Sequence, residues 1–550
     1  MAIGYKSAPT NLRPPWLCWL MPSASDTIFV AFLAVLVMSA VSVRLLGDAG
    51  IGWHIRTGQL ILSTHSIPSV DPFSSSMSGK PWFAWEWLYD AIVGALQNVA
   101  GLNGVVAFTA LIIALTFSWT FRWLLLRGVN VFLALALVLL SASASMIHFL
   151  ARPHVVTWLF AVAWFWILES TEHASWENWK LWLLPLTMLF WVNLHGGFLV
   201  GFVLLAGYWI GATWRLFTLQ EDRFESALEK LHARRRVRRL TVISVLSAAA
   251  TLVNPYGFHL YIHIYRYLGN RFLMDHIDEF QSPNFHYVAQ KCFVGVLLLT
   301  LVALAAKKRE LSATHGFILL FAVYSGLYAS RNIPVSSLLL ILVIGPWLSS
   351  AIEKCVESCA TKRRLGQEQR PVSTFPQRMQ AIESNLRGHL WPIAAVLLII
   401  WITAHNGKLG ARPLVNAQFS PRRFPVQAVD YLEAHDVSGP IVSLDSWGGY
   451  LIYRLYPRVR GVLDDRHDFY GENFFRSYLK MVRDEPGWQD FLQEYHANSV
   501  IVPKNSALAN ILDETRGWRP VFRDQTALLF VRDEPTTEPG GEPMLQKPSH

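Results

Sequence analysis

The chain alternates long apolar segments with short loops that hold many of its charged residues. An α-helix needs about 20 apolar residues to cross the hydrocarbon core of a bilayer, and most of these segments approach that length. The pattern therefore predicts a polytopic α-helical membrane protein with about eleven spans. The predicted spans lie at residues 26–46, 104–126, 130–149, 154–170, 179–195, 197–217, 239–255, 291–306, 313–330, 333–350 and 389–405.

The loops that carry lysine and arginine orient these spans, because short basic loops stay on the cytosolic side of a membrane. Basic residues concentrate in three loops, at 215–239, 307–309 and 362–364. With these loops inside, residues 1–25 are predicted to form a cytosolic segment, and everything after residue 405 is predicted to be external. The first span is too long for the core of a signal peptide, which favours a retained anchor.

Residues 87–101 form an ambiguous apolar segment, WLYDAIVGALQNVAG. If it crossed the membrane, the basic loop at 215–239 would be external, against the lysine and arginine bias. The segment is short and contains Asp90 and Gln97, so we predict an amphipathic helix on the outer surface. The transmembrane domain at 26–405 then carries one large external loop at 47–102, and loops of this kind often hold functional residues.

The C-terminal part of the chain has the patterning of a water-soluble domain. Short apolar runs alternate with amphipathic segments from about residue 424, which predicts an extracytoplasmic α/β domain within 406–533. The tail at 534–550 is rich in Pro, Gly and Glu and is predicted to be disordered. Within the domain we expect helices at 424–435, 449–456 and around 473–496, and strands at 441–444, 461–463, 498–502 and 526–532.

The composition supports the membrane assignment and excludes another class of function. Hydrophobic residues make up 52% of the chain and charged residues only 16%, which is far more apolar than a soluble protein of this size. The formal charge of +9 comes largely from short loops between apolar segments, so it indicates topology and not a nucleic-acid partner. All four cysteines precede residue 406, so no disulfide framework is expected in the external domain.

The external loop at 47–102 contains the strongest group of candidate catalytic residues. Asp48 follows the first span and stands among Gly47, Gly50 and Gly52, which allow a tight turn of the backbone at the membrane surface. Such an acid could act as a general base, although a simple turn or capping acid is the alternative. The same loop concentrates further ionisable side chains, which favours a functional site. The catalytic candidates are Asp48, His54, Asp71 and Glu86, and Arg56 is a candidate for substrate binding.

Three further groups of polar residues lie at predicted outer membrane boundaries. A charge near the bilayer centre costs at least about 2.5 kcal/mol, so these groups are expected at the interface or in a wet cavity. A guanidinium there suits a lipid phosphate, because it neutralises the charge and forms bidentate hydrogen bonds. The alternative is an arginine that reaches ordinary lipid headgroups. The candidates for substrate binding are Arg152 and His154, Asn193 and His195, and Arg331.

Metal binding is open at this stage. His259 and His263 have the i, i+4 spacing of two zinc ligands on one helix, but histidines also occur in aromatic interfacial helices without metal. A hard cation such as Mg²⁺ or Mn²⁺, held by Asp48 and Asp71, is the more plausible cofactor, because its oxygen ligands can come from distant acids.

The order of these features resembles that of the GT-C superfamily of membrane glycosyltransferases. The shared features are the N-terminal anchor, the acid in the first external loop, the helix beside the membrane, the Ala151-Arg152-Pro153 element and the external C-terminal domain. The closest comparison is the bacterial branch related to the protein mannosyltransferases and aminoarabinose transferases. The resemblance extends to about residue 405, and the stretches 445–450 and 464–468 resemble the C-terminal part of bacterial relatives.

The resemblance implies a chemistry and a role for individual residues. GT-C enzymes take a sugar from a polyprenyl-phosphate carrier and use an acid of the first external loop as base or metal ligand, and by position that role falls on Asp48. The chain departs from the pattern at two places. His154 stands where many relatives have an acid, and Gly50, followed by His54, stands where many have a second acid.

The leading hypothesis is an inverting glycosyltransferase of the bacterial inner membrane, with several spans and a cytosolic N-terminus. Its expected partners are a polyprenyl-phosphate-sugar donor, membrane lipids, and an envelope glycan, lipid or protein as acceptor. Two alternatives remain, a transporter or flippase for a lipid-linked sugar and a catalytically silent scaffold for envelope assembly. A flippase is disfavoured because spans such as 291–306 and 389–405 carry almost no polar residues that could line a path.

Overall fold

The computed structural model describes residues 16–173, 175–219, 224–307, 310–363, 379, 382–383, 386, 388–435, 437 and 439–533. These residues form two compact units. Unit 1 contains the described residues of 1–48, 57–67 and 83–418, and unit 2 contains those of 49–56, 68–82 and 419–550. The tail at 534–550, which the sequence predicts to be disordered, lies outside the described residues.

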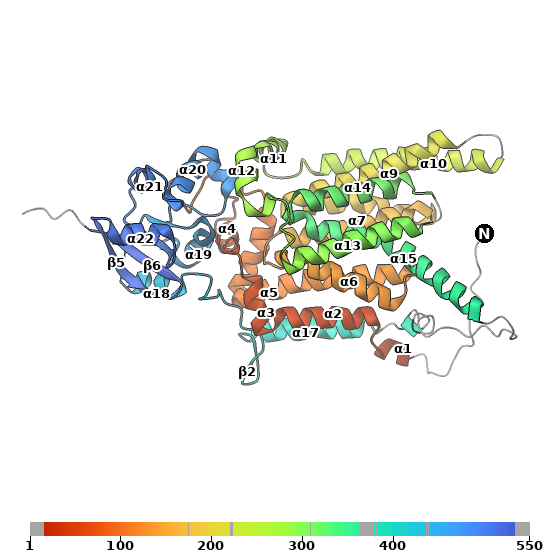
Figure 1. Ribbon diagram of the computed structural model, residues 1–550, viewed down its shortest axis with the longest axis horizontal. Coiled ribbons are helices and arrows are strands. Elements are labelled where there is room, and N and C mark those ends of the chain that lie inside the picture. Colours follow the sequence, from red (N-terminus) through yellow and green to blue (C-terminus); the bar gives the residue numbers. More distant parts are fainter. Residues whose placement is uncertain are drawn as a thin grey trace, which may run out of the picture. The chain divides into compact units, whose positions relative to one another are not determined.

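Unit 1 is a bundle of long helices that lie side by side (Figure 1). Its helices are α1 (Leu17–Leu20), α2 (Ala24–Val37), α3 (Ser39–Leu45), α5 (Trp87–Leu126), α6 (Val131–Ser145), α7 (His154–His173), α8 (Leu183–Leu194), α9 (Leu199–Thr218), α10 (Phe224–Ala250), α11 (His259–Gly269), α12 (Arg271–His276), α13 (Val288–Ala306), α14 (Ala313–Tyr328), α15 (Ile333–Arg363) and α17 (Leu390–Ala404). Helix α4 (Ile51–Thr64) begins in unit 2 and ends in unit 1.

Short elements connect these helices. They are the 3₁₀ turns η1 (Met146–His148), η2 (Ser175–Trp182), η3 (Gly196–Phe198), η4 (Asp278–Phe280) and η5 (Ser330–Asn332), and the two-residue strands β1 (Lys408–Leu409) and β2 (Arg412–Pro413), which pair antiparallel. Four of the turns, all but η2, lie next to residues of the candidate site described below.

Each predicted span coincides, for most of its length, with helical structure. The described helices include seven stretches that are long and apolar enough to cross a membrane, and the apolar helices α14 and α17 are shorter. The protein is a multi-pass membrane protein, as the sequence predicts, while the number of eleven spans stays a prediction. The seven stretches are Cys18–Val37, Trp87–Leu126, Val131–His148, His154–Glu172, Gly196–Thr218, Val288–Ala306 and Ser330–Val356.

Two breaks divide helices of unit 1, one within the first predicted span and one at the segment that the sequence left ambiguous. The first predicted span is divided at Met38, whose extended ψ of 138° separates α2 from α3. Helix α5 is kinked at Gly101, which has a φ of 60° that favours glycine. The kink lies between the segment predicted to be an amphipathic helix, 87–101, and the span predicted at 104–126.

Helix α15 forms the centre of unit 1. Every residue from Leu338 to Ile344 is fully buried within the protein, so this stretch is covered by protein on all sides. Helices α6, α7, α13 and α14 pack against it. The adjoining core contains fully buried aromatic side chains, among them Trp158, Trp164 and Trp191.

Unit 2 is an α/β domain built around a four-stranded sheet in the order β3-β4-β6-β5. Strands β3 and β4 are parallel and the other pairs are antiparallel. The strands are β3 (Ile441–Ser443), β4 (Ser499–Pro503), β5 (Trp518–Arg523) and β6 (Ala527–Arg532); the helices are α18 (Val426–Ala434), α19 (Asp445–Leu455), α20 (His467–Val482), α21 (Trp488–Glu494) and α22 (Ala507–Glu514).

Unit 2 also incorporates two pieces of the first loop, which the sequence assigns to the transmembrane domain. The backbone of Gly449 in α19 meets the backbone of Ala49 so closely that a Cβ on Gly449 would lie 2.3 Å from the Ala49 carbonyl oxygen. Further along the loop, Ser75 N–H donates to the Gly461 carbonyl at 2.9 Å. The segments 49–56 and 68–82 are therefore part of the α/β unit.

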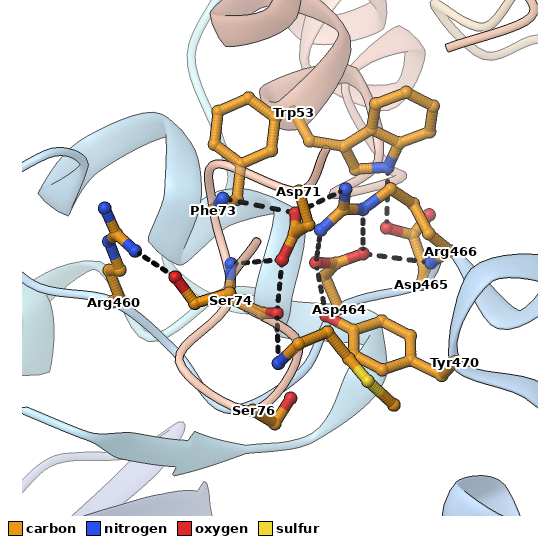
Figure 2. A network of polar contacts seen from close by, with 12 residues as sticks. Trp53, Asp71, Phe73, Ser74, Ser76, Arg460, Asp464, Asp465, Arg466 and Tyr470 are labelled. Carbon is orange, nitrogen blue, oxygen red and sulfur yellow. Dashed lines mark hydrogen bonds and ion pairs between the residues drawn. The ribbon is translucent and has the colours of Figure 1, made fainter. Parts of the chain in front are cut away.

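A buried ion-pair network centred on Arg466 fastens the loop segment 68–82 inside unit 2 (Figure 2). Arg466 Nη1 lies 2.9 Å from Asp71 Oδ1, and Nη2 lies 2.7 Å from Asp464 Oδ2. The three side chains are at most 2% exposed. The guanidinium also lies 4.6 Å from the Trp82 ring, and Tyr470 donates to Asp464 at 2.8 Å. One arginine thus joins residues that are almost 400 positions apart.

The network predicts a large effect of removing Arg466. Arg466→Met leaves two buried carboxylates without their cation, and breaking a buried ion pair in this way costs about 3–5 kcal/mol. We expect unit 2 of the full-length protein in detergent to unfold at much lower urea concentration, measured by pulse proteolysis. The control is Arg519→Met, which removes an exposed pair with Asp533 at 3.4 Å and should change stability by less than about 0.5 kcal/mol. Equal stability of the two variants would contradict a clamping role for Arg466.

Candidate active site

Six ionisable side chains of unit 1 gather where its helices begin or end, and we call them the charged cluster. Arg152 precedes α7, His195 follows α8, and Arg331 lies in η5 before α15. Arg331, Glu279 and Arg152 all lie within electrostatic range of the His195 imidazole. The charged cluster consists of Asp48, Glu86, Arg152, His195, Glu279 and Arg331.

Asp48 and Arg152 form an ion pair, with 2.8 Å between Asp48 Oδ1 and Arg152 Nη1. The Ala151 N–H donates to the Leu45 carbonyl at 2.7 Å, which holds the turn that carries Arg152 against the end of α3. The two side chains keep 34% and 22% of their surface exposed. Because solvent weakens exposed ion pairs, a ligand can compete for either partner.

Arg331 is paired with a second carboxylate, that of Glu279, with 3.1 Å between Arg331 Nη1 and Glu279 Oε1. The neighbouring Phe280 ring lies 4.5 Å from the guanidinium. Burial alone would raise the pKa of Glu279, but Arg331 and the other cationic groups around it together outweigh burial and lower that pKa to about 2. Glu279 is therefore ionised at neutral pH.

His195 faces Glu86, with 3.7 Å between His195 Nε2 and Glu86 Oε1. Its Nδ1 accepts the Gly197 N–H at 3.0 Å and lies 2.8 Å from the Thr157 hydroxyl. Trp191 Nε1 donates to the same hydroxyl oxygen at 3.0 Å, so the hydroxyl proton of Thr157 is directed to His195. We assign the imidazole hydrogen to Nε2 on this basis, which directs an N–H towards Glu86.

Two histidines lie beside the cluster. His154 Nε2 is 2.8 Å from the His148 carbonyl oxygen, and His148 Nε2 is 3.2 Å from the Ser330 carbonyl oxygen. The two rings are 5.5 Å apart. These contacts connect the turn before α7 with the turn before α15, and His148 lies between the candidate His154 and the turn that carries Arg331.

The side-chain amide of Asn193 forms hydrogen bonds within the protein. Its side-chain oxygen accepts the Trp87 indole N–H at 2.7 Å, and its NH₂ group donates to the Leu189 and Val253 carbonyls at 2.8 and 2.9 Å. The amide thus links α5, α8 and the chain after α10. This bonding gives Asn193 a structural role near the cluster.

The other three candidates from the first loop belong to unit 2. Asp71 is the buried carboxylate of the Arg466 network. Arg56 Nε donates to the Tyr453 carbonyl at 2.9 Å. His54 is fully buried and stacks on Trp53 with 3.6 Å between ring centroids. The structure therefore brings Asp48, Glu86, Arg152, His195 and Arg331 together in unit 1, whereas His54, Arg56 and Asp71 have partners within unit 2.

The described residues show which side chains could surround a metal ion. They contain no group of three or more His, Cys, Asp and Glu side chains that could hold one. The Asp48 carboxylate is engaged by Arg152, and that of Asp71 by Arg466. A Mg²⁺ or Mn²⁺ ion held by Asp48 and Asp71 stays a prediction from the sequence.

The two histidines considered for zinc contact aromatic rings. His259 stacks on Phe258 with ring centroids 4.1 Å apart, and His263 stacks on Phe83 at 4.9 Å. In the described structure both histidines of this helix therefore pack against aromatic side chains.

Sequence reasoning missed Glu279, His148 and Thr157. A usable signal existed for Glu279, because an arginine at a membrane boundary needs a counter-charge and the loop at 251–287 contains few acids. His148 and Thr157 lie inside apolar spans and carried no local signal. Their roles depend on which turns and helices meet in the folded chain.

Comparison with known proteins identifies the architecture. No protein-family model matches the sequence. No curated protein matches it either. Among solved structures, the archaeal oligosaccharyltransferase AglB from Archaeoglobus fulgidus, in complex with an inhibitory peptide and a dolichol-phosphate, aligns over 87% of this chain and 69% of its own, with 11% identity and a TM-score of 0.52. The chain has the GT-C fold.

Two further structures give similar alignments. The A. fulgidus oligosaccharyltransferase tethered by a disulfide bond to an acceptor peptide with the NVT sequon aligns over 87% of this chain and 68% of its own, at 12% identity and a TM-score of 0.52. ArnT from Cupriavidus metallidurans, bound to undecaprenyl phosphate, covers 92% and 97% at 12% identity and a TM-score of 0.47. The two alignments with a TM-score of 0.52 confirm the resemblance to GT-C membrane glycosyltransferases at the level of the fold alone.

Unit 2 contains a separate titratable pair in the two stretches that the sequence singled out. His467 Nε2 lies 2.9 Å from Asp445 Oδ2, and Tyr478 donates to Asp445 Oδ1 at 3.0 Å. Burial lowers the pKa of His467, but the hydrogen bond and charge of Asp445 outweigh burial, and the pKa is raised. Burial raises the pKa of Asp445, but the charge of His467 and the hydrogen bonds that Asp445 accepts together outweigh burial, and that pKa is lowered.

This pair predicts how the stability of unit 2 depends on pH. The contribution of His467 is complete below its unfolded pKa of about 6.5 and is lost as pH rises through the raised folded value. The contribution of Asp445 is present above about pH 4 and is lost at lower pH. We expect the urea midpoint of unit 2, from pulse proteolysis of the full-length protein, to fall between pH 6 and 9. His467→Gln should flatten this dependence, and His435→Gln, at an exposed site, should not. An unchanged slope in His467→Gln would refute the assignment.

Proposed function

We propose that the protein is a membrane glycosyltransferase that moves a sugar from a polyprenyl-phosphate donor to an acceptor at the outer face of the bacterial inner membrane. The observation that carries the proposal is the charged cluster, in which an acid and two arginines from distant segments lie together at the ends of apolar helices. The GT-C fold supports it, because AglB shares that fold and is an oligosaccharyltransferase solved with a dolichol-phosphate.

The two arginines are the proposed donor-phosphate site. A guanidinium has five N–H donors in a planar fork, so Arg152 can keep its bond to Asp48 and still bind a phosphate oxygen. Arg331 supplies the second positive charge. Both would act most strongly on the leaving phosphate, because negative charge develops there as the bond to the sugar breaks. His154 and His195 lie beside these groups and are proposed to line the same site.

Asp48 is the proposed general base. In an inverting transfer, the acceptor hydroxyl attacks the anomeric carbon and gives its proton to Asp48, while the bond from that carbon to the phosphate oxygen breaks. The new glycosidic bond forms on the opposite face of the sugar, and polyprenyl phosphate leaves. Arg152 would hold the Asp48 carboxylate in place for this step. Glu86 is proposed to orient His195, since its carboxylate lies closest to Nε2.

The acceptor and the orientation of the protein in the membrane are the remaining parts of the proposed function. The lysine and arginine bias supports a cytosolic N-terminus and an external charged cluster. Unit 2 is proposed to bind the acceptor, which is an envelope glycan, lipid or protein. His54, Arg56 and Asp71 would then serve indirectly, by giving the segments 49–56 and 68–82 their shape within unit 2.

The role of Asp48 leads to a direct test of catalysis. Asp48→Asn keeps the shape of the side chain but removes its charge and its capacity to take a proton. We expect sugar transfer to fall by at least about 100-fold with little loss of folded protein. The measurement is single-turnover transfer from a polyprenyl-phosphate sugar by purified enzyme. Near-normal transfer by Asp48→Asn would move the base to another residue, and no transfer by the wild type would favour the flippase or scaffold.

The role of Arg152 leads to a test of donor binding. Arg152→Lys keeps the charge but loses the planar fork, so we expect weaker polyprenyl-phosphate binding and slower turnover, with Arg152→Ala worse in both. Binding can be titrated on the purified protein in nanodiscs. The matched control is Arg122→Lys, at an exposed arginine that contacts His389, which should bind the lipid as the wild type does. Unchanged affinity in Arg152→Ala would remove Arg152 from the site.

A further inference from the structure

The turn η4 places two side chains directly on Arg331. The Glu279 carboxylate lies 3.1 Å from Nη1 of the guanidinium, and the Phe280 ring lies 4.5 Å from its central carbon. Arg331 and Glu279 keep 29% and 41% of their side-chain surface exposed. The aromatic ring and the carboxylate together fix the position of the guanidinium. The carboxylate also occupies part of its hydrogen-bonding edge.

The position of Glu279 is set by the backbone and is independent of any ligand. Ser330 in η5 donates its backbone N–H and its hydroxyl to the Gln281 carbonyl, at 2.9 and 3.1 Å. The two turns are therefore joined beside the Arg331–Glu279 contact. Glu279 is ionised at neutral pH, as argued above. An anion that reaches Arg331 meets a fixed negative charge beside it.

The two lipids of the proposed reaction differ in charge. The donor is a phosphodiester with one negative charge, whereas the released polyprenyl phosphate is a monoester with a charge of about −1.5 to −2 at pH 7. A site with two arginines and no opposing charge would hold the product more tightly than the donor. Tight product binding slows turnover, since release of product limits many enzymes.

Building on the proposed function, we propose that Glu279 is a specificity residue that competes with the lipid phosphate for Arg331 and weakens binding of the monoester product more than that of the diester donor. Repulsion by a fixed carboxylate acts on each negative charge of the ligand, so the dianion is affected more. Glu279 would thereby favour exchange of product for donor.

The test compares two lipids and two matched variants. The lipids are undecaprenyl phosphate, a monoester, and its methyl ester, a diester. Glu279→Gln removes the charge and keeps the shape, while the control Asp278→Asn removes an exposed charge on the same turn. We expect Glu279→Gln to bind the monoester about tenfold more tightly than the wild type does, with a smaller gain for the diester. Asp278→Asn should change either affinity by less than about threefold, because solvent screens that charge.

The outcomes separate this inference from the function on which it rests. A residue that only supports the fold would lower affinity when changed, so tighter monoester binding by Glu279→Gln is specific to competition. Normal wild-type binding with unchanged or weaker binding by Glu279→Gln would overturn the inference alone. If the wild type binds neither lipid, both the proposed function and the inference fail.

Discussion

The arginines at the charged end of the helix bundle are held in place by carboxylates from distant parts of the chain. A guanidinium at the edge of an apolar bundle is costly unless a counter-charge accompanies it. Arg152 pairs with Asp48 across 104 positions of the sequence, and Arg331 pairs with Glu279, which lies before helices α13 and α14 in the chain. These pairs fix how the turns between helices meet. They also bring together the side chains to which we assign phosphate binding and proton transfer.

The need of an arginine for a counter-charge is stronger still in unit 2, where the arginine is buried. Arg466 is almost fully buried, and both Asp464, two positions before it, and Asp71, from the first loop, satisfy its charge. This pairing draws segment 68–82 into the α/β unit. Asp48 is the last residue of unit 1 before the chain enters unit 2 at Ala49. The proposed base thus directly precedes, in the chain, a segment whose conformation the α/β unit determines.

The sequence predicted well those features that depend on local pattern. Long apolar runs specified the helices, and the helix ends at Arg152, His195 and Arg331 were recognised because ionisable groups avoid the bilayer centre. Strand β5 and helix α22 were missed: β5 contains Pro520 and is largely exposed, as edge strands often are, and α22 has only eight residues. The ion-pair partners were not predictable in the same way. Asp71 looked like a catalytic acid of an exposed loop, and only the folded structure places Arg466 on it.

The central claim is that the charged cluster binds a lipid phosphate beside the Asp48 carboxylate. The most direct measurement is a cryo-electron microscopy structure of the protein in nanodiscs with undecaprenyl phosphate. The account predicts phosphate density within hydrogen-bonding distance of both Arg152 and Arg331, with the isoprenoid tail between helices of unit 1. Lipid phosphate bound elsewhere, with both arginines still paired as in the free protein, would contradict it.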